Sequence, residues 1–275
     1  MKNMKKAMAA LLAAAMLCTA FVGCGSKKND KKGMLIKEGV LNVGMEIGYP
    51  PFEDKAEDGS PVGYDVDLVN ALGEKMGLEV NLIDTAFDVI FAGIDTNYDC
   101  VVSAVTITDE RRQNCLFSDP YIENFQAVAV KKGSDLKVSS LKDLSGHSVI
   151  LQKGTTSEDL LDDMIATGTV TDCTKSATEQ ILTCFTTLDN GEYEMVLCDS
   201  TVAQDYVTKF PDKYEIVYTD NEYPEQFGIA MGKNNTELQA AINKAMAELK
   251  AEGFFEKNAE KWLRNDVTVS DSDAD

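Results

Sequence analysis

The sequence predicts an α/β protein with two lobes, each built from a sheet flanked by helices. Short apolar runs alternate with segments of helical period along most of the 275-residue chain, a pattern typical of parallel sheets covered on both faces. The alternation occurs in two series, one within residues 40–105 and one within residues 148–218. Two series with separate strands indicate two sheets and therefore two lobes.

The first series contains three apolar runs short enough to be strands. They are Val40–Met45, Val80–Ile83 and Cys100–Val105. Apolar residues at spacings of three and four predict the two helices between these strands. The first helix has its apolar stripe at Val66, Val69, Leu72 and Met76, and the second has it at Phe87, Ile90, Phe91 and Ile94.

The second series repeats the alternation. The predicted strands are Ser148–Leu151, Met195–Cys198 and Ile216–Tyr218, and the predicted helices are Thr156–Ile165, Thr178–Leu188 and Thr201–Lys209. Beyond this series, one more helix is predicted by an apolar stripe at Leu238, Ile242, Ala245 and Leu249. The segment Thr236–Gln239 has the capping-box pattern at its start, and Gly253 ends it.

The first 23 residues have the pattern of an export signal. A basic start, Met1–Lys6, precedes sixteen uncharged, mostly apolar residues, Ala7–Val22. A membrane-spanning helix needs about 20 apolar residues, so the run is short for an uncleaved anchor, which is the alternative interpretation. The segment Phe21-Val22-Gly23-Cys24 resembles the lipobox of bacterial lipoproteins. We therefore expect residues 24–33 to be a lipidated Cys24, with palmitate among its acyl chains, and a polar tether at the extracytoplasmic face of the cell membrane.

Charge and composition argue against several kinds of function. The chain has 46 acidic and 26 basic residues and a formal net charge of −20, so it lacks the basic face that nucleic-acid binding needs. The single His, His147, argues against imidazole-rich metal sites and Ser-His-Asp catalysis, and the lack of a CxxC motif argues against a thiolate metal site. We expect no metal and no cofactor. Of the five cysteines after Cys24, Cys173 and Cys184 are the one pair worth testing as a disulfide.

Polar and aromatic side chains follow four of the predicted strands, where ligand sites of α/β folds lie. The four segments are Glu46–Phe52, Ser103–Arg111, Gly154–Glu158 and Asp199. The third combines a Gly with hydroxyl groups at a helix N-terminus, which can bind an anion. Arg111 can bind a carboxylate and Asp199 can bind an ammonium group. Together, these segments therefore supply partners for both charged groups of a zwitterion.

Each of these residues also has an ordinary structural interpretation. The alternatives are an N-cap for Thr155 and Thr156, a helix cap for Asp199, a surface ion pair for Arg111 and a core position for Tyr49, Phe52 and Phe87. The combination of one cation, one carboxylate and one helix N-terminus favours ligand binding.

The chain resembles the extracellular solute-binding proteins of polar amino-acid ABC transporters from about Leu41 to Leu263. The segment with the most specific resemblance is Gly63-Tyr64-Asp65-Val66-Asp67-Leu68, at the start of the first long helix. The supporting segments are Tyr49-Pro50-Pro51-Phe52, Thr106–Arg111, Phe117–Tyr121, Gly154-Thr155-Thr156, Gln226–Ala230 and Lys261-Trp262. The resemblance implies a type II periplasmic-binding-protein-like fold, in which two hinge strands cross between the lobes near Glu123–Gln126 and Asp220–Gln226.

This resemblance also implies domain boundaries and a function. Lobe 1 would comprise residues 34–124 and 226–265, lobe 2 residues 125–225, and residues 266–275 an acidic tail. The protein would be a lipid-anchored receptor, and not an enzyme. It would bind a polar or basic L-amino acid between its lobes and deliver it to an ABC permease in the membrane.

The family's ligand contacts correspond to eight residues of this chain. By the resemblance, Arg111 would bind the α-carboxylate and Asp199 would bind the α-ammonium, and Thr106 and Thr156 would add hydrogen bonds to the same groups. Tyr49 and Phe87 would flank the ligand side chain, and Glu46 would face its far end. Gln226 would lie at the second crossing. Ala104 departs from the family, because a ligand-binding hydroxyl is common at this position.

Two other functions and the identity of the ligand stay open. Exported cyclohexadienyl or arogenate dehydratases resemble the same motifs, and Glu46 or Glu222 would then be the general acid. A lipoprotein that reports an amino acid to a signalling partner is the second alternative. A buried Glu46 favours a polar or cationic side chain, which leaves arginine, lysine, histidine, glutamine and cystine as ligands.

Overall fold

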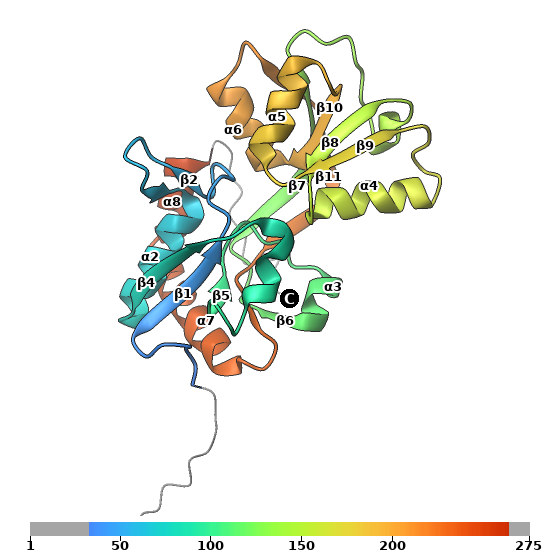
Figure 1. The fold of residues 1–275 in the computed structure, drawn as a ribbon. Helices are drawn as coiled ribbons and strands as arrows, with labels where there is room; N and C mark the ends of the chain where they lie inside the picture. Colours follow the sequence, from blue (N-terminus) through green and yellow to red (C-terminus); the bar gives the residue numbers. More distant parts are fainter. Residues whose placement is uncertain (1–32, 264–275) are drawn as a thin grey trace, which may run out of the picture. The chain divides into compact units, whose positions relative to one another are not determined.

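The computed structural model describes residues 33–263, which contain two five-stranded sheets with helices beside them (Figure 1). The order of the first sheet is β4 (Glu79–Asp84), β1 (Val40–Met45), β5 (Cys100–Val101), β12 (Ala230–Gly232) and β6 (Cys115–Phe117). The order of the second is β11 (Tyr214–Phe227), β7 (Ile122–Lys131), β10 (Met195–Asp199), β8 (Ser148–Gln152) and β9 (Thr174–Thr178). A short hairpin pairs β2 (Asp54–Lys55) with β3 (Pro61–Val62). The predicted two-lobed α/β fold is confirmed.

The longer helices divide between the two lobes. In the first lobe, α2 (Tyr64–Met76), α7 (Thr236–Ala251) and α8 (Phe254–Trp262) pack against one another, and α2 and α7 contact the first sheet. In the second lobe, α4 (Thr156–Ala166), α5 (Ile181–Asn190) and α6 (Ser200–Lys209) contact the second sheet. The remaining turns of helix are η1 (Phe87–Gly93), α3 (Asp109–Asn114) and η2 (Leu141–Leu144).

Both sheets are mixed, whereas the alternation of strands and helices predicted parallel ones. In the first sheet, β1 runs parallel to β4 and β5, but β12 is antiparallel to β5 and β6. In the second sheet, β8 runs parallel to β9 and β10, but β7 is antiparallel to β10 and β11. The antiparallel strands β7, β11 and β12 lie where the chain leaves one sheet and returns to the other, so they do not follow the βαβ order.

The chain passes from the first sheet to the second through β7 and returns through β11. These two long strands pair with Asp220 opposite Gln126 and Gln226 opposite Glu123, which are the segments where the crossings are predicted. Their register is irregular between Asp220 and Glu225. The exact lobe boundaries stay a prediction.

Two of the predicted helices differ in the structure. The helix predicted over Thr178–Leu188 is shorter, because Thr174–Thr178 forms β9 and α5 begins only at Ile181. The β-branched threonines at both ends of β9 favour a strand. The helical stripe that starts at Phe87 belongs to a seven-residue 3₁₀ helix, η1, rather than to an α-helix.

Two element ends also differ from the prediction. The strand that begins at Cys100 ends at Val101, and Ala104 then has a φ of 46°, a left-handed conformation that a strand excludes. Helix α7 is capped by Asn235, whose side-chain oxygen accepts a hydrogen bond from the backbone N–H of Leu238 at 3.3 Å. Asn is among the preferred N-cap residues, so it takes the place of the predicted capping box.

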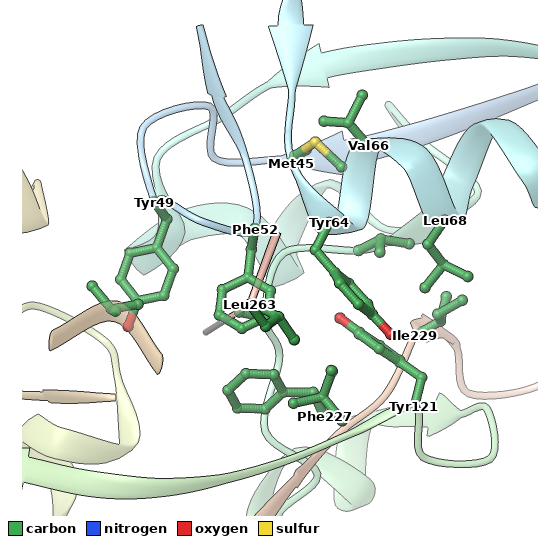
Figure 2. Packing of buried hydrophobic residues seen from close by; sticks show 14 of the residues in the cluster. Met45, Tyr49, Phe52, Tyr64, Val66, Leu68, Tyr121, Phe227, Ile229 and Leu263 are labelled. Atoms are coloured by element: carbon green, nitrogen blue, oxygen red, sulfur yellow. The ribbon is translucent and has the colours of Figure 1, made fainter. Parts of the chain in front are cut away.

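An aromatic cluster fixes the loop that follows β1 (Figure 2). The fully buried Phe52 ring lies 5.4 Å from the Phe227 ring, 6.2 Å from the Tyr64 ring and 6.5 Å from the Tyr49 ring, measured between centroids. Phe52 is therefore a core residue. Tyr49 lies at the edge of the cluster, so its ring is held by packing while its hydroxyl remains available for polar contacts.

Some predictions concern residues that the structure does not describe. The export signal, Cys24, the tether up to residue 32 and the acidic tail lie outside residues 33–263. Within the described residues, the five cysteines are free, so Cys173 and Cys184 do not form a disulfide. None of the helices in this part of the chain has the length and apolar character that spanning a membrane requires.

Candidate functional site

A narrow pocket brings together most of the residues predicted to bind a ligand. It contains about 260 Å³ of space free of protein atoms, including open solvent at its mouth. Its lining consists of Tyr49, Phe87, Ala104, Thr106, Arg111, Gln152, Thr155, Thr156 and Asp199. These residues come from both lobes, and six of the eight predicted binding residues are among them. We refer to it as the central pocket.

Arg111 on α3 extends over this pocket from the first lobe. Its guanidinium donates hydrogen bonds to the backbone carbonyl of Thr106 at 2.9 Å and to that of Gly154 at 3.2 Å. The rings of Phe87 and Phe91 lie 5.5 and 5.2 Å from its Cζ atom, within the range of cation–π attraction. Burial lowers the pKa of Arg111, although nearby carboxylates oppose this change. The guanidinium is thus held inside the pocket and is not a surface ion-pair partner.

Asp199 is the carboxylate at the carboxyl end of β10. Its Oδ2 atom accepts a hydrogen bond from the Tyr49 hydroxyl at 2.5 Å, and its Oδ1 atom accepts one from the Asn124 amide at 2.7 Å. Although Asp199 occupies the N-cap position of α6, its side chain makes no capping hydrogen bond, so the helix-cap interpretation is wrong. Burial raises the pKa of Asp199 to about 7, and the negative charge of Glu225 adds to the effect.

Two predicted threonines donate to a carboxylate that the sequence analysis does not single out. The hydroxyl of Thr106, in the first lobe, donates to Oε2 of Glu225 at 3.0 Å, and that of Thr156, at the start of α4, donates to the same atom at 3.1 Å. The Nε2 amide of Gln126 donates to the other oxygen of Glu225 at 3.0 Å. The N-cap interpretation is correct for Thr155, whose hydroxyl accepts from the Glu158 N–H.

Glu46 lies behind the pocket lining and meets it through Gln152. The Nε2 amide of Gln152 donates to both carboxylate oxygens of Glu46, at 2.9 and 2.7 Å, and to the Glu179 carbonyl at 2.9 Å. Glu46 is buried, and this burial raises its pKa to about 7 in spite of the Gln152 hydrogen bonds. A buried acid next to an amide favours a ligand end that carries hydrogen-bond donors.

Gln226 does not line the central pocket. Its backbone carbonyl accepts a hydrogen bond from the Ile107 N–H at 2.8 Å, which fixes the end of β11 against the first lobe. The preceding residue, Glu225, is the one whose side chain reaches the pocket residues, because successive side chains of a strand point to opposite faces.

Sequence reasoning therefore missed four polar residues of the site, Asn124, Gln126, Gln152 and Glu225. Gln152 directly follows the predicted strand Ser148–Leu151, and the other three lie within the predicted crossings. The same rule that selected Asp199, a polar residue at a strand end, would have selected Gln152. Within residues 33–263, no group of three or more His, Cys, Asp and Glu side chains is arranged to hold a metal ion.

The chemistry of the site suits a zwitterion with a polar or cationic end. Arg111 and the hydroxyls of Thr106 and Thr156 are donors for a carboxylate. Asp199 is an acceptor for an ammonium group, and Glu46 places a second carboxylate behind Gln152.

Comparisons with known proteins find a family and several relatives that match most of this chain. The family model of bacterial extracellular solute-binding proteins, family 3, matches residues 41–265. The L-cystine-binding protein TcyJ of Escherichia coli (strain K12) is 33% identical over 259 residues, covering 92% of this chain and 94% of TcyJ. A probable histidine-binding protein of Neisseria gonorrhoeae is 32% identical over 266 residues, covering 95% of this chain and 96% of the relative.

Solved structures show the same architecture. An ancestral arginine-binding protein bound to arginine is 38% identical, with a TM-score of 0.76, and covers 82% of this chain and 98% of its own. The ancestral amino acid-binding protein AncCDT-1, a precursor of cyclohexadienyl dehydratase, is 31% identical, with a TM-score of 0.75, and covers 82% of this chain and 95% of its own.

Proposed function

The chain belongs to the bacterial extracellular solute-binding proteins, family 3, and from this membership we propose that it binds a polar or cationic L-amino acid in the central pocket and delivers it to an ABC permease. The relatives named for cystine, histidine and arginine binding support an amino acid as the ligand. The observation that carries the proposal is the placement of Arg111 and Asp199, of opposite charge, in one pocket between residues of both lobes.

Each group of the ligand has a partner in this proposal. The α-carboxylate binds the guanidinium of Arg111 and the hydroxyls of Thr106 and Thr156. The α-ammonium binds Asp199, which Tyr49 and Asn124 hold in place through hydrogen bonds.

The ligand side chain then extends towards Gln152 and Glu46. The ring of Phe87, which lines the pocket, is positioned to pack against it. Because the site holds more carboxylates than cations, we infer a preference for a side chain that is cationic or rich in hydrogen-bond donors.

Binding in such a pocket favours closure of the lobes. Thr106 and Arg111 belong to the first lobe, whereas Thr156 and Asp199 belong to the second. A ligand that contacts both sets stabilises the closed arrangement relative to the open one. The crossing strands β7 and β11 are the segments that would bend.

A dehydratase on the same scaffold receives less support from the site. Gln152 already donates hydrogen bonds to both oxygens of Glu46, and Glu222 is exposed in the irregular part of β11. The curated relatives at 32–33% identity are named as binding proteins.

Calorimetric titration of the full-length protein with the L-amino acids and cystine tests the proposal. One of them should bind to the wild type, and the Arg111→Ala variant should bind it roughly 10- to 100-fold more weakly, because a charged hydrogen-bonding partner is lost. Arg112→Ala is the matched control, since Arg112 is the exposed neighbour on the same helix. Release of an aromatic product from prephenate or arogenate, with no amino acid bound, would overturn the receptor function in favour of the enzyme.

We further propose that lipid on Cys24 anchors the protein to the extracytoplasmic face of the membrane. The basic, apolar and small-residue order of residues 1–25 supports it. In a fractionation experiment, the wild type should sediment with membranes and the Cys24→Ala variant should not. Equal sedimentation of both would refute the anchor.

A further inference from the structure

Glu225 is a half-buried carboxylate at the central pocket, and it is not among the residues proposed above to contact the ligand. We propose that Glu225 occupies the carboxylate subsite of the unliganded pocket and is displaced when the α-carboxylate of an amino acid binds. The inference rests on the proposed function for the identity of the displacing group.

The hydrogen bonds of Glu225 are those that a bound carboxylate needs. Its Oε2 atom accepts from the hydroxyls of Thr106 and Thr156, at 3.0 and 3.1 Å, and its Oε1 atom accepts from Gln126 at 3.0 Å. A hydroxyl has one proton to donate. Thr106 and Thr156 therefore cannot donate to Glu225 and to a ligand at once, and the two carboxylates compete for the same donors.

The charges around Glu225 explain why an internal carboxylate is stable there. Its negative charge, like that of Asp199, favours the charged form of Arg111 against the cost of burial. Gln126 connects the two acids, since its amide donates to Glu225 and also lies 3.4 Å from Oδ1 of Asp199. Glu225 thus adds negative charge near Arg111, and an incoming α-carboxylate would supply the same charge.

Displacement of Glu225 needs only a rotation of its side chain. Its backbone pairs with Asn124 on β7, whereas the four residues before it, Asn221–Pro224, are exposed in the irregular part of β11. The side chain can therefore move towards solvent while the strand pairing persists.

An internal carboxylate changes selectivity as well as affinity. An amino acid must displace Glu225, but an amine without a carboxylate can bind beside it. Glu225 therefore reduces the preference of the pocket for an amino acid over the corresponding decarboxylated amine.

Binding of matched probe pairs tests this inference. The probes are L-arginine with agmatine and L-histidine with histamine, titrated into the wild type, Glu225→Ala and the control Glu222→Ala, which removes an exposed carboxylate from the same strand. Removal of Glu225 should strengthen binding of the amino acid about tenfold, as expected for the loss of a competitor with hydrogen bonds to two hydroxyls and an amide, and should not strengthen binding of the amine. Glu222→Ala should leave both unchanged.

Equal weakening of the binding of both probes would contradict the inference. If Glu225→Ala weakens the binding of the amino acid and of the amine by the same factor, Glu225 contacts the ligand ammonium and the inference is wrong. The variant Glu225→Gln, which keeps the size of the side chain, should give a smaller gain in affinity and guards against misfolding of the Ala variant.

A second measurement needs no ligand and separates this inference from the proposed function. Because Glu225 connects Thr106 of one lobe to Thr156 of the other, its removal should open the unliganded protein. Small-angle scattering should then give a larger radius of gyration for Glu225→Ala than for the wild type and Glu222→Ala. An unchanged radius would mean that the other contacts between the lobes, Tyr49–Asp199 and Gln152–Glu46 among them, suffice without Glu225, and would contradict its role in connecting the lobes. If the radius rises but the wild type binds no amino acid, the proposed function fails while the contact of Glu225 with both lobes stands.

Discussion

At the scale of single residues, Asp199 and Glu46 are two acids that the pocket keeps buried. Burial raises the pKa of each to about 7, so a fraction of each carboxyl is protonated near neutral pH. A cationic ligand binds the ionised form. Binding therefore has to remove any proton that these acids hold.

This coupling predicts that affinity depends on pH. Both pKa values are raised in the unliganded protein and should fall when an ammonium or guanidinium group binds, so affinity should rise with pH up to about 7 and level off above it. Below pH 7, each acid that must lose a proton weakens binding by at most about tenfold per pH unit. The check is calorimetric titration with L-arginine between pH 5 and 8.5.

Glu46→Gln separates the two contributions. In this variant only Asp199 loses a proton, so the slope below pH 7 should become shallower than in the wild type. An identical slope in both proteins would show that Glu46 does not face the ligand.

The individual site residues were predictable where a strand end placed them. Asp199 comes directly after an apolar run and Arg111 lies six residues beyond the end of one, and the structure brings both into one pocket. Glu225 was not predictable, since the irregular register before it decides which of Glu225 and Gln226 faces the pocket. Such an irregularity depends on the pairing with β7, which lies far away in the sequence.

At the scale of elements, the start of α2 determines where the Tyr49 loop lies. Gly63 precedes this helix with a φ of 141°, a conformation that L side chains rarely adopt. A Cβ atom on Gly63 would lie 2.1 Å from the Phe52 carbonyl oxygen, so only glycine permits the close approach of loop and helix.

Gly63→Ala should therefore destabilise the protein and weaken ligand binding. We expect a loss of about 3 kcal/mol or more in the free energy of unfolding, because both the conformation and the contact with Phe52 are violated. Gly59→Ala is the matched control, as Gly59 also has a positive φ, of 84°, but nothing lies within 4 Å of an added Cβ atom. It should cost roughly 1–2 kcal/mol and leave affinity intact. Equal effects in denaturant unfolding would contradict the steric argument.

Most elements with an apolar period of their own were predictable, and those defined by distant partners were not. Helices α2, α4, α6 and α7 lie where the periodicity predicts them. By contrast, β6 and β12 have three residues each and are strands because they pair with each other across more than a hundred residues of sequence. The local sequence pattern carries no information about such a distant partner. For the same reason, the pattern predicted parallel sheets although the sheets are mixed.

At the scale of the whole molecule, the acidic character of the chain extends into its core. Glu53 and Asp65 are fully buried and lie close together, and burial raises the pKa of both carboxyls, that of Asp65 to about 7. Asp65 accepts hydrogen bonds from the Ala104 N–H at 2.7 Å and from the Tyr121 hydroxyl at 3.0 Å. The pair thus connects α2 to the loop that lines the central pocket, and burial favours the protonated form of both carboxyls.

Buried acids of this kind predict that the unliganded protein loses stability as pH rises. The pKa of an Asp in the unfolded chain is about 3.9, so between about pH 4 and 7 the folded state holds a proton at Asp65 that the unfolded state releases. This contribution to the free energy of unfolding is fully present below pH 4 and is lost as pH rises through 7.

Asp65→Asn keeps an acceptor for Ala104 and Tyr121 but removes the titration of the Asp65 carboxyl, so the stability of this variant should fall less between pH 5 and pH 8 than that of the wild type. Asp67→Asn, on the same helix but in contact with Lys261 and Trp262 at its surface, should shift the stability at both pH values alike. Parallel curves for the wild type and Asp65→Asn in thermal unfolding would mean that Asp65 itself holds no extra proton in the folded protein between pH 5 and pH 8.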